Sequence, residues 1–121
     1  GRRFRSLKLW WVLRSYGATG IRHHVREHVR MARDLDARIA GDPRFTLVAP
    51  TLFSLVSFRH VGGEQATSDL AAAINATGKA MVTSSKIDDE AFIRVSIAQT
   101  RTEPRHVDAL WRIIDDHAAP R

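Results

Sequence analysis

The 121-residue chain contains no cysteine, so it has neither a disulfide framework nor a thiolate metal site. It also lacks any apolar run approaching the ~20 residues that a membrane-spanning helix needs. Its N-terminal stretch lacks the charged-then-apolar-then-small order of a signal peptide. Together these absences favour a cytoplasmic protein that does not enter a membrane.

Motifs of nucleophilic and phosphate-binding enzymes are missing as well. There is no G-x-S-x-G nucleophile elbow. The Gly62-Gly63 pair lacks the lysine and hydroxyl residues of a phosphate-binding loop. The acidic run Asp88, Asp89 and Glu90 is explained by a hairpin turn. We therefore predict no catalytic residue within this chain.

Positive charge is present and is concentrated near the N-terminus. Residues 1–44 carry 11 Lys and Arg against 4 Asp and Glu (+7), whereas residues 45–121 carry 8 against 9 (−1). A basic half can attract nucleic acid, but no nucleic-acid-binding motif accompanies it. We expect a solvated arginine-rich helix face or a surface that meets a partner domain. A basic nucleic-acid-binding module is the alternative.

The first predicted helix is apolar all round. It runs over 7–16, with Ser6 as N-cap and Gly17 at its end. Its apolar residues are Leu7, Leu9, Trp10, Trp11, Val12, Leu13 and Tyr16. A helix of this kind is normally buried on all sides, and a chain of this size can hardly enclose one at its own terminus. We expect another part of the native protein to cover it; the alternative is a stand-alone dimerisation module that covers it by self-association.

The remaining chain predicts an α+β fold. Helical periodicity, caps and stops place helices at about 20–40 (cap Thr19), 68–77 (cap Thr67) and after Thr102, and strands at 45–49, 52–61, 80–87 and 91–98. This order indicates a mainly antiparallel sheet of about four strands with helices packed on one face, preceded by the apolar N-terminal helix.

Three histidines in "HHVREH" are candidate metal ligands. His24 and His28 are four residues apart and could share an ion. His23 and His28, however, lie about 140° apart around a helix, so the three side chains cannot converge. His24 and His28 also border the apolar stripe, where a histidine often packs and bonds a carbonyl. We therefore predict no metal site.

Arg94 is the strongest candidate for ligand binding. In "AFIRVSIA", Ile93 and Val95 share one face of a strand, and Phe92, Arg94 and Ser96 share the other. A charged residue in mid-strand needs water, an ion pair or an anionic ligand. Arginine suits a carboxylate because its planar fork binds both oxygens. A structural ion pair or a solvated head group is the alternative.

Several segments resemble a known family. In order, "RRFRSLKLWWVLRSYG", "IRHHVREHVRMARDL", "DPRFTLVAP", "LVSFRH" and "FIRVSIAQTRT" resemble the C-terminal region of the group II pyridoxal-phosphate-dependent amino-acid decarboxylases, and most of all their aromatic-L-amino-acid decarboxylase branch. The resemblance covers roughly residues 2–118. The first segment is quite specific, and the others gain weight from their shared order and spacing.

The resemblance implies a homodimeric, cytoplasmic enzyme of fold type I that decarboxylates an L-amino acid, in this branch an aromatic one. Residues 1–18 would be the interdomain helix segment, and residues 19–121 the C-terminal small domain. The family's cofactor lysine follows a histidine and lies upstream of the matched region. Lys8, Lys79 and Lys86 do not follow a histidine. This chain alone is therefore expected to bind no pyridoxal 5'-phosphate and to be inactive, as a fragment of the parent enzyme.

The resemblance also assigns partners and a site residue. It implies that the large cofactor-binding domain of the same polypeptide, together with the second subunit, covers the apolar first helix. Arg94 looks similar to an arginine that related decarboxylases direct at a substrate carboxylate near the domain junction. Phe92 and Ser96 would then lie next to that contact.

Overall fold

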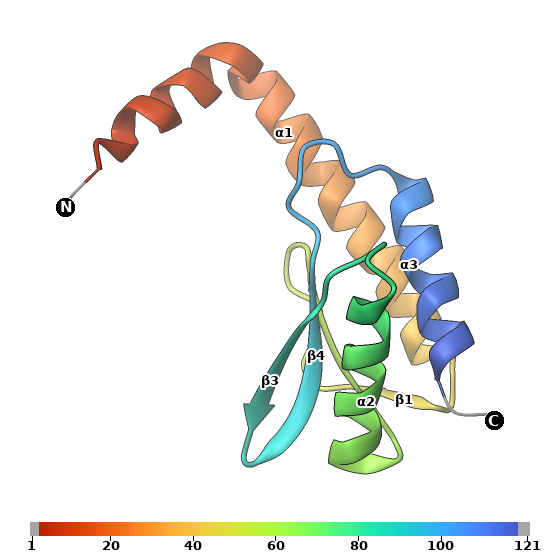
Figure 1. The fold of residues 1–121 in the computed structure, drawn as a ribbon. Coiled ribbons are helices and arrows are strands. Elements are labelled where there is room, and N and C mark those ends of the chain that lie inside the picture. The colour runs from red at the N-terminus through yellow and green to blue at the C-terminus, as the bar shows by residue number, and fades with distance from the viewer. Residues whose placement is uncertain (1–2, 119–121) are drawn as a thin grey trace.

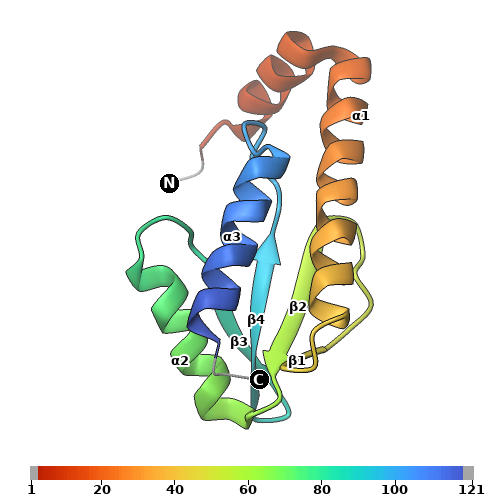
Figure 2. The same ribbon diagram turned by 90° about the vertical axis from the view of Figure 1, so that its right-hand side faces the viewer.

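The computed structural model describes residues 3–118 and contains, in that range, three helices and a four-stranded sheet. The elements are α1 Arg5–Ala40, β1 Phe45–Leu47, β2 Leu55–His60, α2 Gly63–Ala76, β3 Thr83–Ile87, β4 Glu90–Ser96 and α3 Pro104–His117. The sheet order is β1-β2-β4-β3, and every pair is antiparallel. Figures 1 and 2 show the C-terminal part of α1, α2 and α3 on one side of the sheet. The predicted α+β fold is confirmed.

The core lies between the sheet and these helices. Alternation along β2 buries Val56, Phe58 and His60 and leaves the residues between them only partly covered. Apolar helical stripes supply the other side of the core: Met31, Leu35 and Ile39 from α1, Leu70 and Ile74 from α2, and Val107, Leu110 and Ile114 from α3. Because the helices occupy one side only, the opposite face of the sheet is left open.

Helix α1 consists of two helical segments joined by a kink at Gly17, which has φ 65° and ψ 173°. The predicted end of the first helix is thus confirmed. The helix begins at Arg5 with Phe4 in the N-cap position and no side-chain cap bond, so the predicted cap at Ser6 is wrong. We call residues 5–16 the N-terminal arm; it projects from the body of the molecule (Figure 1).

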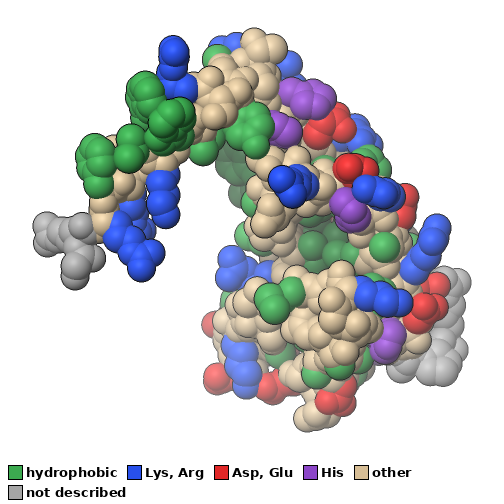
Figure 3. Space-filling model, turned by 45° about the horizontal axis from the view of Figure 1, so that its top comes forward, with side chains coloured by type: hydrophobic (Ala, Val, Ile, Leu, Met, Phe, Trp, Pro, Cys, Tyr) green, Lys and Arg blue, Asp and Glu red, His purple; other side chains and the backbone are tan. Residues whose placement is uncertain are grey.

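The N-terminal arm has no buried residue. Leu9, Trp10 and Trp11 are 60%, 51% and 58% exposed. Figure 3 shows hydrophobic side chains gathered along the arm, with open space between the arm and the body. The arm's own helical contacts include a T-shaped pair of the Trp10 and Trp11 rings, with centroids 5.1 Å apart. The apolar surface expected from the sequence is therefore present and uncovered by the described part of the chain.

The caps predicted for α2 and α3 differ from the structure. Helix α2 begins at Gly63, so Thr67 lies inside it and is not its cap. Helix α3 is capped by Glu103, whose side chain forms a capping box with His106, and not by Thr102. In both helices a residue other than the predicted threonine occupies the cap position, Gly62 for α2 and Glu103 for α3.

The second strand also starts later than predicted. Leu52 and Phe53 belong to a turn before β2, and both side chains are largely exposed. Phe53 has φ 52°, which an extended strand cannot contain. The β3–β4 hairpin agrees with its prediction, because Asp88 and Asp89 form the turn. No helix within residues 3–118 has the length and apolar character needed to cross a membrane.

Candidate functional site

The open face of the sheet carries Arg94 at its centre. Arg94 on β4 pairs in register with Ser57 on β2 and with Thr83 on β3. Its strand neighbours Ile93 and Val95 are buried against the helices, so Arg94 itself points to the uncovered side. The predicted division of β4 into two faces is confirmed.

Arg94 is exposed and has no ion pair among the residues that the structure describes. The two strands beside it contribute small hydroxyl residues at the paired positions, Ser57 and Thr83. A guanidinium in these surroundings keeps all five N–H donors available for an incoming group. Within residues 3–118 Arg94 does not form the ion pair that was its alternative, and its side chain is open to solvent or to a ligand.

The neighbours of Arg94 on the same face differ in character. Phe92 is only 7% exposed, although it does not belong to the main core cluster between sheet and helices. It helps to line a hollow of about 260 Å³ that also includes Arg59. Ser96 is exposed and pairs in register with Leu55. The open face therefore has an apolar ring on one side of Arg94 and a hydroxyl on the other.

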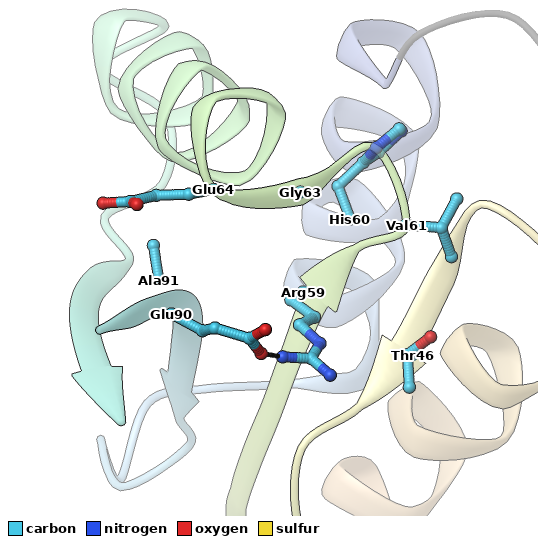
Figure 4. A pocket seen from close by; sticks show the side chains of 8 residues that line it. All are labelled: Thr46, Arg59, His60, Val61, Gly63, Glu64, Glu90 and Ala91. Atoms are coloured by element: carbon cyan, nitrogen blue, oxygen red, sulfur yellow. Dashed lines mark ion pairs between the residues drawn. The ribbon is translucent and has the colours of Figure 1, made fainter. Parts of the chain in front are cut away.

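A larger pocket of about 530 Å³ lies at the end of the sheet where β2 leads into α2 (Figure 4). Arg59 and Glu90 form an ion pair within it, joining β2 to β4. Glu64 at the start of α2 forms a second ion pair with Lys86 on β3, at 2.5 Å between Oε1 and Nζ. Because both carboxylates already have cationic partners, this pocket is a polar hollow held by salt bridges.

The arm and the open face lie on the same side of the molecule. The helices that cover the sheet lie on one side of it (Figure 2). The arm turns away from the rest of α1 toward the opposite, open side of the sheet (Figure 1). The arm, which carries the exposed Trp10 and Trp11, and the exposed Arg94 therefore lie on the same side of the sheet. Neither surface is covered by residues 3–118 themselves.

The lysines of the chain do not form a cofactor site. Lys8 lies on the exposed arm, Lys79 is exposed after α2, and Lys86 is exposed and paired with Glu64. A lysine that forms a Schiff base lies in a desolvated pocket or beside another cationic group. None of the three has such a setting in the described structure, so the residues present do not fit pyridoxal phosphate.

The histidines of α1 are used for packing. The His28 ring is 9% exposed, and its Nε2 lies 3.0 Å from the carbonyl oxygen of Gln99. His24 packs edge-on against Tyr16, with ring centroids 5.1 Å apart. Within residues 3–118, no three His, Cys, Asp or Glu side chains are grouped closely enough to hold a metal ion. The predicted role of His28, packing with a bond to a carbonyl, is confirmed.

The arginine stripe of α1 is a solvated helix face. Arg30 makes ion pairs with Glu27 at 2.9 Å and with Asp34 at 3.0 Å, and all three side chains are about half exposed. Arg26 and Arg22 are exposed about one and two turns earlier, respectively. Pairing of Arg30 within the helix agrees with the expected solvated, arginine-rich helix face.

The sequence analysis missed Arg59 and Glu90 as a pair. They are 31 positions apart, and only the β2–β4 register brings them together. The available signal was the alternation of β2, which puts Arg59 on the same face as Leu55 and Ser57. Without the strand order, the sequence does not indicate which residue pairs with Arg59.

With this geometry in view, the chain can be compared with known proteins. Tryptophan decarboxylase 2 of Oryza sativa is 37% identical over 125 residues, which is 98% of this chain and 25% of that protein. The crystal structure of Oryza sativa TDC with PLP and tryptamine has a TM-score of 0.86 at 35% identity, covering 98% of this chain and 27% of that one. The chain thus spans about a quarter of the length of the relatives it matches.

A second solved structure widens the set of reactions among the relatives. The 4-hydroxyphenylacetaldehyde synthase of Rhodiola rosea has a TM-score of 0.87 at 38% identity, covering 98% of this chain and 27% of that one. The pyridoxal-dependent decarboxylase conserved domain matches residues 1–61, just over half of the chain. The chain therefore belongs to the pyridoxal-dependent decarboxylase family.

Proposed function

We propose that this chain is the C-terminal small domain of a pyridoxal-phosphate-dependent decarboxylase that acts on an aromatic L-amino acid. Residues 1–18 join it to the large cofactor-binding domain, and residues 19–121 form the small domain. The intact enzyme is a cytoplasmic homodimer of fold type I. The observation that carries the proposal is the match to Oryza sativa tryptophan decarboxylase 2 over 98% of this chain but 25% of that protein.

The exposed arm supports the same proposal. Monomeric proteins rarely expose a contiguous apolar surface of this kind, and a larger one marks an interaction site. The arm presents Leu9, Trp10, Trp11 and Leu13 at 49–60% exposure. Complete burial of a fully exposed large apolar side chain is favourable by about 1.5–3 kcal/mol, and these side chains, about half exposed, retain part of that gain. In the proposed enzyme, the large domain and the second subunit cover this surface.

Arg94 is the residue of this chain that we propose to face the active site. Its guanidinium is exposed and free of ion pairs among residues 3–118. It therefore has both hydrogen-bonding edges available for the carboxylate of the amino-acid substrate. Pyridoxal phosphate bound to the large domain would supply the electron sink that decarboxylation needs. The chain's own contribution is to orient the carboxylate and to close the site.

In the proposed reaction the substrate loses its carboxyl group, and the product is identified by experiment. Relatives of similar identity carry the names of a tryptophan decarboxylase and of a 4-hydroxyphenylacetaldehyde synthase. Mass spectrometry of the reaction mixture separates an amine from an aldehyde. Either product agrees with the proposal, whereas an unchanged amino acid contradicts it.

The full-length protein tests the function and the role of Arg94 together. Pyridoxal phosphate added to it should give the visible absorbance of an internal aldimine, and the 121-residue chain should give none. Arg94→Ala should raise KM for the amino acid by roughly 10–100-fold, the equivalent of a lost charge-assisted hydrogen bond of about 1.5–3 kcal/mol. Arg112→Ala, at an exposed position on α3, is the control. Absence of cofactor uptake would refute the function, and unchanged kinetics of Arg94→Ala would return Arg94 to a solvated role.

A further inference from the structure

The direction of the N-terminal arm depends on one residue, Gly17. Its φ of 65° and ψ of 173° lie in a region of backbone conformation that is essentially restricted to glycine. Apart from its chain neighbours and the backbone of its own helix, a Cβ atom built on Gly17 would meet nothing within 4 Å. Space is therefore not the reason for a glycine here. The residue is required only for the backbone conformation that produces the kink.

The residues on either side of Gly17 are helical, so a single change of backbone conformation would remove the kink. Helical values at this position would make Arg5–Ala40 one straight rod of 36 residues, about 54 Å long. The arm would then extend beyond the top of the molecule, away from the sheet. Figures 1 and 2 show instead that the arm turns toward the side on which the sheet is open.

We propose that Gly17 is a positioning residue that aims the arm so that one body contacts the arm and the Arg94 face at the same time. This inference rests on the function proposed above, and the body is the large domain of the same polypeptide. The chain covers only about a quarter of its relatives, and the exposed Trp10 and Trp11 need a cover that residues 3–118 do not supply. A straight helix would separate the two surfaces.

Gly17 acts through Arg94 in this scheme. The arm fixes the small domain on the large one, and the kink angle decides where the open face, and Arg94 with it, comes to rest. A change at Gly17 therefore displaces the guanidinium relative to the substrate carboxylate and weakens substrate binding. Cofactor binding is unaffected, because none of the chain's lysines contributes to it.

The chain itself allows a direct test of the hinge. It has no cysteine, so Ser6→Cys and Thr83→Cys give one spin-label pair between the arm and the open face. Gly17→Ala should lengthen the distance between the labels by an amount on the order of 10–20 Å, since the arm of 12 residues is about 18 Å long. Gly78→Ala is a matched control, because Gly78 has φ 66° and equally open surroundings but lies after α2. An unchanged distance in Gly17→Ala overturns the proposal.

The full-length protein tests the consequence for catalysis. Gly17→Ala should raise KM at least 10-fold with the aldimine absorbance retained, and Gly78→Ala should change KM less than 2-fold. The double variant Gly17→Ala/Arg94→Ala should be no worse than Arg94→Ala alone, because both changes remove the same contact. Independent, multiplying effects would overturn action through Arg94. If the unmodified protein takes up no cofactor, the proposed function fails, while the label distances still decide whether Gly17 sets the arm's direction.

Discussion

Arg44 donates a hydrogen bond from Nη2 to Oδ2 of Asp42 at 2.7 Å, and both side chains are almost fully buried, at 8% and 3% exposure. Nε of Arg44 donates to the second carboxylate oxygen at 3.0 Å, so the contact is bidentate. The same guanidinium pairs with Asp115 on α3. These hydrogen bonds, first those with Asp42 and then those with Asp115, raise the pKa of Arg44 above its ordinary value. The contact between Arg44 and Asp115 ties the chain entering β1 to the last helix.

Replacing Arg44 should therefore destabilise the fold strongly. Arg44→Leu leaves the buried Asp42 carboxylate without its main cation, and loss of one partner of a buried pair costs about 3–5 kcal/mol. The measurement is the free energy of unfolding in urea at pH 7. Arg112→Ala, at an exposed position, should stay within about 0.5 kcal/mol of the unmodified chain. A loss below about 1 kcal/mol for Arg44→Leu would contradict the inferred role of the pair.

The exposed pair on α1 makes a prediction about pH. The hydrogen bond from Arg30 holds the pKa of Glu27 below the ordinary value of 4.5. A lowered folded-state pKa gives stability that is present above the unfolded-state value and is lost as the pH falls through the lowered value. Carbon-detected NMR titration of the Glu27 carboxyl should show the low value in the unmodified chain and a higher one in Arg30→Ala. Arg22→Ala, on the same helix, should leave the titration unchanged, and an equal shift in both variants would contradict the pairing.

Much of the fold follows from patterns that the sequence displays locally. The buried face of each element can be identified from alternation along β2 and β4 and from the apolar stripes of α1 and α3. The reason is that the spacing of apolar residues within a short stretch indicates which face is buried. Gly17 is likewise a local signal, because glycine is common where a helix ends. The face on which Arg94 lies is a consequence of strand alternation alone.

Contacts between distant parts of the chain could not be predicted in this way. Arg44 meets Asp115, 71 positions further on, and Arg59 meets Glu90 only because β2 pairs with β4. Local patterns carry no information on which strands are neighbours. The predicted helix cap at Thr67 is wrong for a related reason. Thr67 has the chemistry of a cap, but its hydroxyl forms hydrogen bonds that connect β2 with α2.

Thr67 provides a further prediction. Its Oγ1 accepts a hydrogen bond from the backbone N–H of His60 at 3.0 Å and donates one to the carbonyl of Gly63 at 2.9 Å. Thr67 is fully buried, so Thr67→Val leaves a buried N–H without its acceptor and should destabilise the chain by about 1–3 kcal/mol. Thr67→Ser keeps the hydroxyl and should lose less. Urea unfolding of the two variants decides, and equal stability of the valine variant and the unmodified chain would refute the role.

The arm should contribute to association and not to stability. Trp10 and Trp11 are more than half exposed, so changing both to Gln should alter the free energy of unfolding by no more than about 0.5 kcal/mol. The same variant should reduce self-association of the 121-residue chain, measured by light scattering over a concentration series. A cooperative loss of stability would mean that the arm is packed in solution, contrary to the structure.

The β3–β4 turn gives a prediction that depends on backbone conformation alone. Asp88 and Asp89 have φ of 51° and 63°, and Ile87 and Glu90 pair on either side, so the hairpin is closed by a two-residue turn with both central residues left-handed. Such turns favour glycine at the second position, because a side chain there costs about 1–2 kcal/mol in the left-handed region for most residues. Asp89→Gly should raise the free energy of unfolding by about 0.5 kcal/mol, since part of the gain is offset by the freer unfolded chain. Asp89→Ala should lower it, because alanine lacks the tolerance of aspartate for this conformation. Protection of the β3 and β4 amides from hydrogen exchange should follow the same order, with the glycine variant most protected, then the unmodified chain, then the alanine variant. A reversed order of protection would show that the turn has a different backbone from the one described.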